Sequence, residues 1–260
     1  GRYGDPSDLI VSRFVLALLT MLIIMNVLNV QLKFPQKSLK FVIAASTLIV
    51  FYNFNYLKGT QIGLSSLGGV IVPTISPLFT YVLSMIFLNK QTHVKEICGL
   101  LIGLIGGILL IRAWEVNVEN IVSSGNLYFL IGALLWSGVT IFAQKTNDEL
   151  HPLNFSFWVY GIAMLIALPI FPLNSIDAIF KYDLLFWFNF ILISVVALGI
   201  GTTAYFITTM RLGSHKASSF MFIVPFSAVL SASIFLGETI QISTIFGGIF
   251  STGAVYLINK

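Results

Sequence analysis

Residues 66–90 read SLGGVIVPTISPLFTYVLSMIFLNK, a run without a charged side chain before Lys90. A helix needs about 20 apolar residues to cross the hydrocarbon core of a bilayer, so this run is long enough to span a membrane. The strands of a membrane barrel are about 10 residues long and alternate in polarity, which this continuous run does not. It therefore predicts a transmembrane helix.

Similar apolar runs recur along the whole chain, separated by short polar or proline-containing turns. Each is close to the length that a membrane crossing requires. We predict nine spans, with approximate bounds Leu9–Asn29, Leu39–Leu57, Ile62–Leu88, Glu96–Ile111, Gly125–Gln144, Pro152–Phe171, Leu184–Thr209, Ala217–Leu236 and Ile242–Asn259.

The composition excludes a water-soluble fold. The 260 residues are 57% hydrophobic and only 9% charged, with a mean hydropathy of +0.94, whereas soluble domains carry about 25% charged residues. The net charge of +4 comes from basic residues scattered singly between apolar runs, so we expect no nucleic-acid partner. The sequence predicts an all-α membrane protein, a polytopic helical bundle whose surroundings are the lipid bilayer.

Basic residues are distributed unequally between the two sides of the membrane. Cytoplasmic loops are richer in Lys and Arg, so the richer side predicts the orientation and places the C-terminus in the cytoplasm. The richer set of alternate loops holds Lys33, Lys37, Lys40, Lys90, Lys95, Lys145, Arg211, Lys216 and Lys260, and the poorer set holds Arg2, Lys58, Arg112 and Lys181.

The sequence contains an internal repeat. At an offset of 148 residues, residues 60–109 align with residues 208–257 without a gap. Residues 214–238 read SHKASSFMFIVPFSAVLSASIFLGE, so Pro77 aligns with Pro225, the tripeptide Ile-Phe-Leu at 86–88 recurs at 234–236, and Gly99 aligns with Gly247. We interpret residues 1–118 as a first repeat of four spans and residues 119–260 as a second repeat of five.

This repeat predicts an architecture of two inverted five-helix halves. The second copy begins with the span 125–144, which has no counterpart in the first copy, so we expect the first helix of the bundle to lie upstream of Gly1. Because five spans is an odd number, the two copies would cross the membrane in opposite directions, as in many secondary transporters.

The segments 66–90 and 214–238, each followed by a glycine-containing span, resemble the EamA-like branch of the drug/metabolite transporter superfamily. The Leu-Gly-Glu at 236–238 and the Asp-Pro followed by Arg13 near the start are also similar to that family, whereas Asn89-Lys90 replaces its usual Gly-Glu. The resemblance implies ten helices in two inverted halves with a central cavity, and a role in transporting amino acids, nucleobases or other small metabolites.

From these features we predict a secondary transporter that moves a small amphipathic or zwitterionic solute, such as an amino acid, by alternating access. We expect an exporter in a bacterial inner membrane. Two alternatives stay open, namely a membrane-embedded lipid-handling enzyme and an accessory membrane subunit that does not itself transport. We expect no cofactor, and the sequence leaves the oligomeric state open.

Polar and aromatic side chains deep within the spans are the candidates for a substrate cavity, because such groups fix the orientation of a ligand in an otherwise apolar site. They come from both repeats. The candidates are Tyr52, Asn53, Tyr56, Thr74, Ser76, Tyr81, Trp136, Ser137, Thr140, Thr202, Tyr205, Ser218 and Ser227. Among these, Tyr56, Tyr81, Trp136 and Tyr205 are predicted to approach one cavity.

Arg13 is the one cation that lies inside a predicted span rather than at its end. It either reaches out to the membrane surface or faces the cavity, where it would attract a carboxylate or phosphate. Prolines at 73, 77 and 225 lie inside apolar runs, where they remove a helical hydrogen bond and predict kinks. The equivalent pair Pro77 and Pro225 is a candidate for two hinges.

The acidic residues and histidines are predicted to lie at span ends or in loops, where water hydrates their charge. His93, His151 and His215 are widely separated in the sequence and have no Cys or carboxylate at ligand spacing, so no metal site is predicted. No serine has a histidine and an acid arranged for nucleophilic catalysis, so we predict that the chain is not an enzyme.

Overall fold

The computed structural model describes residues 8–63, 65–91, 93–112, 114, 125–171, 182–236 and 241–260, and these residues form helices and the turns between them. The helices are α1 (Asp8–Val27), α2 (Leu39–Ile62), α3 (Ser65–Leu88), α4 (Val94–Ile111), α6 (Leu127–Lys145), α7 (Pro152–Ile170), α9 (Leu184–Ile191), the π-helix η1 (Leu192–Thr202), α10 (Thr203–Leu212), α11 (Ser214–Ser219), the 3₁₀ turn η2 (Phe220–Phe222), α12 (Ile223–Leu236) and α13 (Ile242–Asn259).

The predicted spans are confirmed as helices. Among the described residues, eight helices are long and apolar enough to cross a membrane. One of them is the continuous helix 184–212, which α9, η1 and α10 form together. The remaining predicted span, Ala217–Leu236, folds instead as α11 and α12, which the 3₁₀ turn η2 joins. The chain is thus an all-helical polytopic membrane protein.

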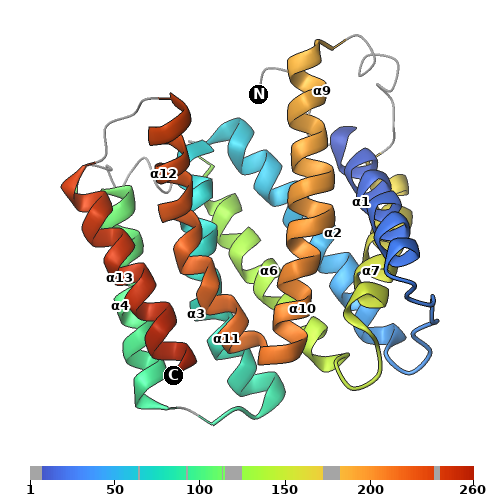
Figure 1. Cartoon of the computed structure of the whole chain (residues 1–260), viewed down its shortest axis with the longest axis horizontal. Coiled ribbons are helices and arrows are strands. Elements are labelled where there is room, and N and C mark those ends of the chain that lie inside the picture. The colour runs from blue at the N-terminus through green and yellow to red at the C-terminus, as the bar shows by residue number, and fades with distance from the viewer. Residues whose placement is uncertain are drawn as a thin grey trace.

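The helices run side by side between two ends of the bundle (Figure 1). α1, α3, α6 and α10 end at the lower end in this view, where α13 also ends, and α2, α4 and α7 begin there. The turns at this end carry the basic residues of the richer set, so we call it the lysine-rich end. The unequal distribution in the sequence therefore corresponds to one physical end of the bundle.

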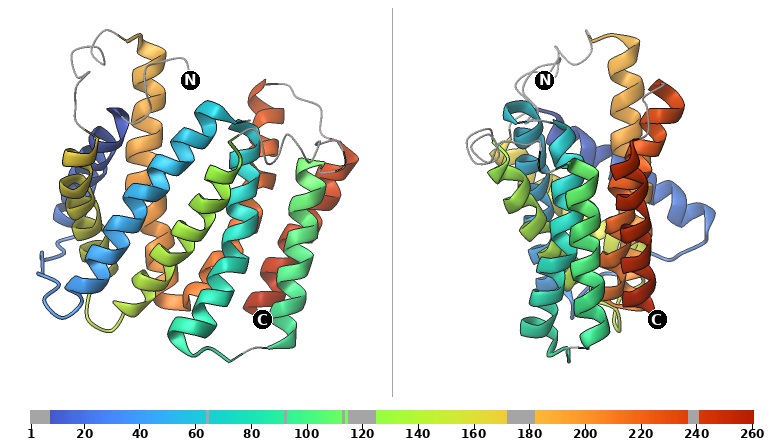
Figure 2. Two further views of the ribbon diagram at one scale, coloured as in Figure 1. Left: turned by 180° about the vertical axis from the view of Figure 1, so that it is seen from behind. Right: turned by 90° about the vertical axis from the view of Figure 1, so that its left-hand side faces the viewer.

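Repeat-equivalent helices pair at the two flanks of the bundle. α4 packs against α13 at one flank and α1 packs against α7 at the other, which Figure 2 shows from behind and from the side. A Cβ atom on Gly99 would lie 2.5 Å from Ile258 Cγ1, and one on Gly247 would lie 2.7 Å from Leu110 Cγ. At the offset of 148 residues, Gly99 corresponds to Gly247 and Leu110 corresponds to Ile258. The two contacts are therefore equivalent, as expected when the halves of an inverted repeat pack against each other.

The largest buried cluster lies between α1, α2, α6, α7 and α10. Its most buried large side chains include Phe14, Met21, Phe155, Tyr160 and Phe206. Backbone polar groups in a bilayer need partners within the protein, which helices provide. Among the candidate cavity residues, Trp136 belongs to this cluster, and Tyr52 and Tyr205 pack against it.

Candidate functional site

Four aromatic side chains from three helices form a continuous row through the centre of the bundle. Tyr56 and Tyr52 of α2 have ring centroids 5.9 Å apart, Tyr52 and Trp136 of α6 are 4.9 Å apart, and Trp136 and Tyr205 of α10 are 5.2 Å apart. We call Tyr52, Tyr56, Trp136 and Tyr205 the aromatic row. Rings at these separations pack favourably and present both an apolar face and a polar edge.

The lower part of the row is fixed by a hydrogen bond between helices. The Tyr205 hydroxyl lies 3.1 Å from Thr140 Oγ1, which also donates to the carbonyl of Trp136 at 2.9 Å. Thr140 is fully buried and Trp136 is 7% exposed. α6 and α10 are thus joined at the point where two of the predicted site residues meet.

Arg13 of α1 lies beside the upper part of the row. Its guanidinium interacts electrostatically with the phenol groups of Tyr52 and Tyr56. Its Nε atom is buried and has no hydrogen-bond partner among the described residues. The side chain therefore turns toward the interior rather than toward the membrane surface. A buried guanidinium donor without an acceptor favours an anionic group as its partner.

Several predicted site residues bond to the backbone of their own or a neighbouring helix. Ser137 Oγ lies 2.9 Å from the carbonyl of Ser76, and Ser76 Oγ donates to Val72 O at 2.7 Å. The Asn53 side chain donates to Ile49 O at 2.8 Å. Ser76 and Ser137 thus hold α3 and α6 together, a role that hydroxyl groups often have between membrane helices.

Four further candidates lie apart from the aromatic row. Thr74 packs against Gly107, and its hydroxyl has no partner among the described residues. Thr202 ends the π-helix and bonds weakly to Ala197 O at 3.4 Å. Ser218 donates to His215 O at 3.1 Å, and Ser227 is exposed on α12.

Tyr81 does not join the aromatic row, contrary to our expectation that it would share a cavity with Tyr56, Trp136 and Tyr205. Its hydroxyl lies 3.3 Å from Glu96 Oε2 at the lysine-rich end. The sequence indicates that Tyr81 is within a span but not which way the side chain points, and α3 directs it toward α4.

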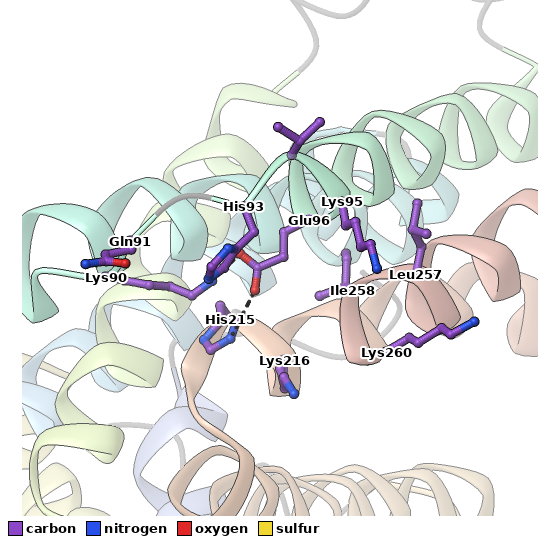
Figure 3. A pocket seen from close by; sticks show the side chains of 11 residues that line it. Lys90, Gln91, His93, Lys95, Glu96, His215, Lys216, Leu257, Ile258 and Lys260 are labelled. Atoms are coloured by element: carbon purple, nitrogen blue, oxygen red, sulfur yellow. Dashed lines mark hydrogen bonds and ion pairs between the residues drawn. The ribbon is translucent and has the colours of Figure 1, made fainter.

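Glu96 corrects the expectation that acidic residues at span ends are hydrated. Only 7% of Glu96 is exposed, and its carboxylate forms an ion pair with Lys90. His215 Nε2 lies 3.4 Å from Glu96 Oε1, and His93 lines the same pocket (Figure 3). Residues far apart in the sequence, including two histidines that we expected to be separate, therefore meet at one place.

The ionisation of His215 follows from this setting. Burial, together with the nearby charges of Lys90 and Lys216, lowers its pKa to about 4, although Glu96 acts in the opposite direction. At neutral pH the imidazole is uncharged, so it can donate one hydrogen bond or accept one. In the described residues, no group of three or more His, Cys, Asp or Glu side chains could hold a metal ion.

The three prolines differ in their surroundings. α3 continues without interruption past Pro73 and Pro77, and both are buried. Pro225 is instead the third residue of α12, directly after the 3₁₀ turn η2. The missing N–H costs little in the first turn of a helix, so the irregularity at this span lies before Pro225 rather than at it.

Tyr160 and the π-helix η1 were not predicted from the sequence. The Tyr160 hydroxyl donates to the Leu198 carbonyl at 2.8 Å and lies 3.2 Å from Thr203 Oγ1. A π-helix leaves backbone groups displaced from the usual ladder, and such segments are frequent at functional sites. The pair Gly199 and Gly201 was the available signal, because small residues allow close approach of a neighbouring helix; here Gly199 faces Thr20 of α1.

Comparisons with known proteins agree with this architecture. The model of the EamA-like transporter family matches residues 1–112 and 123–260. A solved crystal structure superposes with a TM-score of 0.75 at 14% identity, covering 99% of this chain and 88% of that one, which supports the fold alone.

Three curated relatives are similar over most of their length. The uncharacterized transporter YoaV of Bacillus subtilis is 23% identical, covering 94% of this chain and 84% of the relative. The uncharacterized transporter YvbV of the same organism is 24% identical, covering 80% and 68%. A "probable amino-acid metabolite efflux pump" of Salmonella typhimurium is 24% identical, covering 86% and 77%. These names describe transporters rather than enzymes, and the chain belongs to the EamA-like transporter family.

Proposed function

We propose that this transporter exports a small amphipathic solute that carries a carboxylate, such as an amino acid, and binds it along the aromatic row. The carboxylate would contact Arg13, and the apolar part would lie against Trp136. The family and the efflux relative from Salmonella support transport of small metabolites. The observation that carries the proposal is the buried Nε of Arg13, which lacks an acceptor beside two phenol groups.

The electrostatics of the site favour this class of substrate over a polyanion. Arg13 is the one Lys or Arg inside the described helices that interacts with the row, whereas a nucleotide sugar would need several buried cations. An amine could lie over the aromatic faces, since cations bind the faces of Trp and Tyr rings. A zwitterion fits both requirements.

The proposed cycle is alternating access between two inverted halves, with the lysine-rich end in the cytoplasm of a bacterial inner membrane. Pro77 and Pro225 are equivalent in the repeat and are the proposed hinges. The boundary between the halves, near residue 118, lies in the segment 115–124, outside the described residues, and stays a prediction.

Counterflow in proteoliposomes tests this proposal. Vesicles containing the protein are loaded with one unlabelled metabolite and diluted into a trace of the same labelled metabolite. We expect saturable accumulation with amphipathic amino acids and none with their decarboxylated amines, because the amines lack the group that Arg13 would bind. Equal exchange of an amino acid and its amine would contradict the proposed role of the carboxylate.

A further inference from the structure

A pocket at the lysine-rich end combines positive charge with an apolar floor. Its volume is about 650 Å³, and it lies between the start of α4, α11 and the end of α13. Lysines at 90, 95, 216 and 260 line it together with Glu96, the one acidic side chain among its lining residues in the described part of the chain. Leu257 and Ile258 form the apolar floor. Figure 3 shows Lys90, His93 and His215 close to Glu96, with Lys95, Lys216 and Lys260 farther from it.

The lining residues of this basic pocket carry more positive than negative charge. Glu96 is paired with Lys90, so these two charges cancel. Lys95, Lys216 and Lys260 take part in none of the ion pairs found among the described residues. His215 is uncharged at neutral pH because burial lowers its pKa to about 4. Three uncompensated ammonium groups therefore surround the pocket, which favours an anionic ligand.

A second, apolar groove lies beside α13. Phe226 and Leu230 of α12 and residues Ile245, Ile249, Gly253 and Tyr256 of α13 line it, and its volume is about 680 Å³. A Cβ atom on Gly253 would meet nothing within 4 Å, so the missing side chain leaves open space there. The groove thus offers an apolar surface that the described residues leave uncovered.

Lys260 connects the pocket and the groove. It lines the basic pocket, and its Nζ lies 5.5 Å from the centre of the Tyr256 ring, which lines the groove. From 245 to 256 the groove extends about 16 Å along α13, at 1.5 Å per residue. One leaflet of the hydrocarbon core is about 15 Å thick, so the groove matches the depth of an acyl chain below a headgroup.

We propose that the chain binds an anionic phospholipid here, with its phosphate among Lys95, Lys216 and Lys260 and one acyl chain in the groove between α12 and α13. The charge, the depth and the position at one end of the bundle all match such a molecule. Basic pockets between membrane helices on the cytoplasmic side commonly hold anionic headgroups. A general excess of lysine on the cytoplasmic side explains which end is basic but not why three free lysines adjoin an apolar groove.

The thermal stability of the purified full chain in mixed micelles tests the proposal, because a ligand that binds only the folded state raises Tm progressively as its concentration exceeds its Kd. Phosphatidylglycerol should raise Tm progressively with its mole fraction in the micelles, phosphatidylcholine should not, and inorganic phosphate should have little effect because it lacks the acyl chain. Equal effects of the two lipids would overturn the proposal. An effect of inorganic phosphate as large as that of phosphatidylglycerol would show a free-anion site and overturn the lipid assignment.

Matched variants separate the headgroup from the acyl chain. Replacing Lys95 and Lys260 by Gln should weaken the binding of phosphatidylglycerol roughly 30-fold, because each lysine near the membrane surface contributes about 1 kcal/mol. The control with Lys33→Gln and Lys37→Gln removes the same charge from the turn before α2 and should leave the affinity unchanged. Equal weakening by both pairs would indicate general attraction and contradict a defined site.

Gly253→Leu should fill the groove and abolish most of the phosphatidylglycerol effect. Gly69→Leu is the control, because a Cβ atom on Gly69 also meets nothing within 4 Å but lies on α3. A full phosphatidylglycerol effect in Gly253→Leu would contradict the acyl-chain assignment. A wild-type dimer that Gly253→Leu dissociates, with no dependence on lipid, would assign the groove to a second copy instead. All these measurements are independent of transport.

Discussion

Gly106 and Gly247 face each other across the contact between α4 and α13. A Cβ atom on Gly106 would lie 3.0 Å from the carbonyl oxygen of Gly247, and a Cβ atom on Gly247 would lie 3.0 Å from the carbonyl oxygen of Gly106. Small residues let the backbones of membrane helices approach closely. This reciprocal contact joins the last described helix of each repeat.

Gly106→Ala should therefore destabilise the protein. The new methyl group would meet the backbone of Gly247 and Ser251, which cannot rotate away, and overpacking of this kind costs about 1–3 kcal/mol. Gly253→Ala is the matched control on α13, where the methyl group meets open space. Unfolding in a denaturing detergent should show a loss for Gly106→Ala only, and equal stability of the two variants would argue against a tight contact.

Removing one member of the Lys90–Glu96 ion pair should destabilise the protein more than removing both. Glu96→Leu leaves the Lys90 ammonium, whose side chain is 14% exposed, without its partner. We expect a loss of about 2 kcal/mol, below the 3–5 kcal/mol typical of a fully buried pair. The double variant Lys90→Met with Glu96→Leu should recover most of this loss. A double variant as unstable as the sum of the single variants would show that the two charges do not interact.

Lowering the pH should reduce the free energy of unfolding through His215 at the lysine-rich end. The pKa of His215 is about 4 in the folded chain and about 6.5 when unfolded, so between these values the unfolded state binds more protons. The contribution of this group to stability is complete above pH 6.5 and is lost as the pH falls toward 4. His215→Gln should flatten the pH dependence of unfolding in this window. An unchanged profile in His215→Gln would refute the assignment.

The positions of most helices could be predicted from the sequence, because lipid requires long apolar runs and each run is local. The exception is the predicted span 217–236, which forms two helices joined by a turn. The repeat also predicted that Gly99 and Gly247 occupy equivalent positions in the two halves. Side-chain direction was harder, as Tyr81 shows, since the sequence does not specify how far each helix is rotated. The burial of Glu96 could not be predicted, because His215 approaches it only after the two repeats pack together.

The proposed hinges predict a separation of binding from turnover. Pro77→Ala restores an N–H inside the continuous helix α3, whereas Pro225→Ala does so in the first turn of α12. We therefore expect Pro77→Ala to slow transport more than Pro225→Ala, with substrate affinity unchanged in both. Binding and counterflow measured on the same preparations decide the point. Unchanged turnover in both variants would leave the prolines as packing features.

The most direct test of the proposed site compares counterflow in Arg13→Gln and Arg211→Gln. Arg211 is exposed at the end of α10, so it controls for the loss of one positive charge. A charge-assisted hydrogen bond contributes about 1.5–3 kcal/mol, so Arg13→Gln should raise the half-saturating amino-acid concentration about 10- to 150-fold while Arg211→Gln leaves it unchanged. If both variants exchange the amino acid with wild-type affinity, Arg13 does not bind its carboxylate, and the proposed binding site along the aromatic row is contradicted.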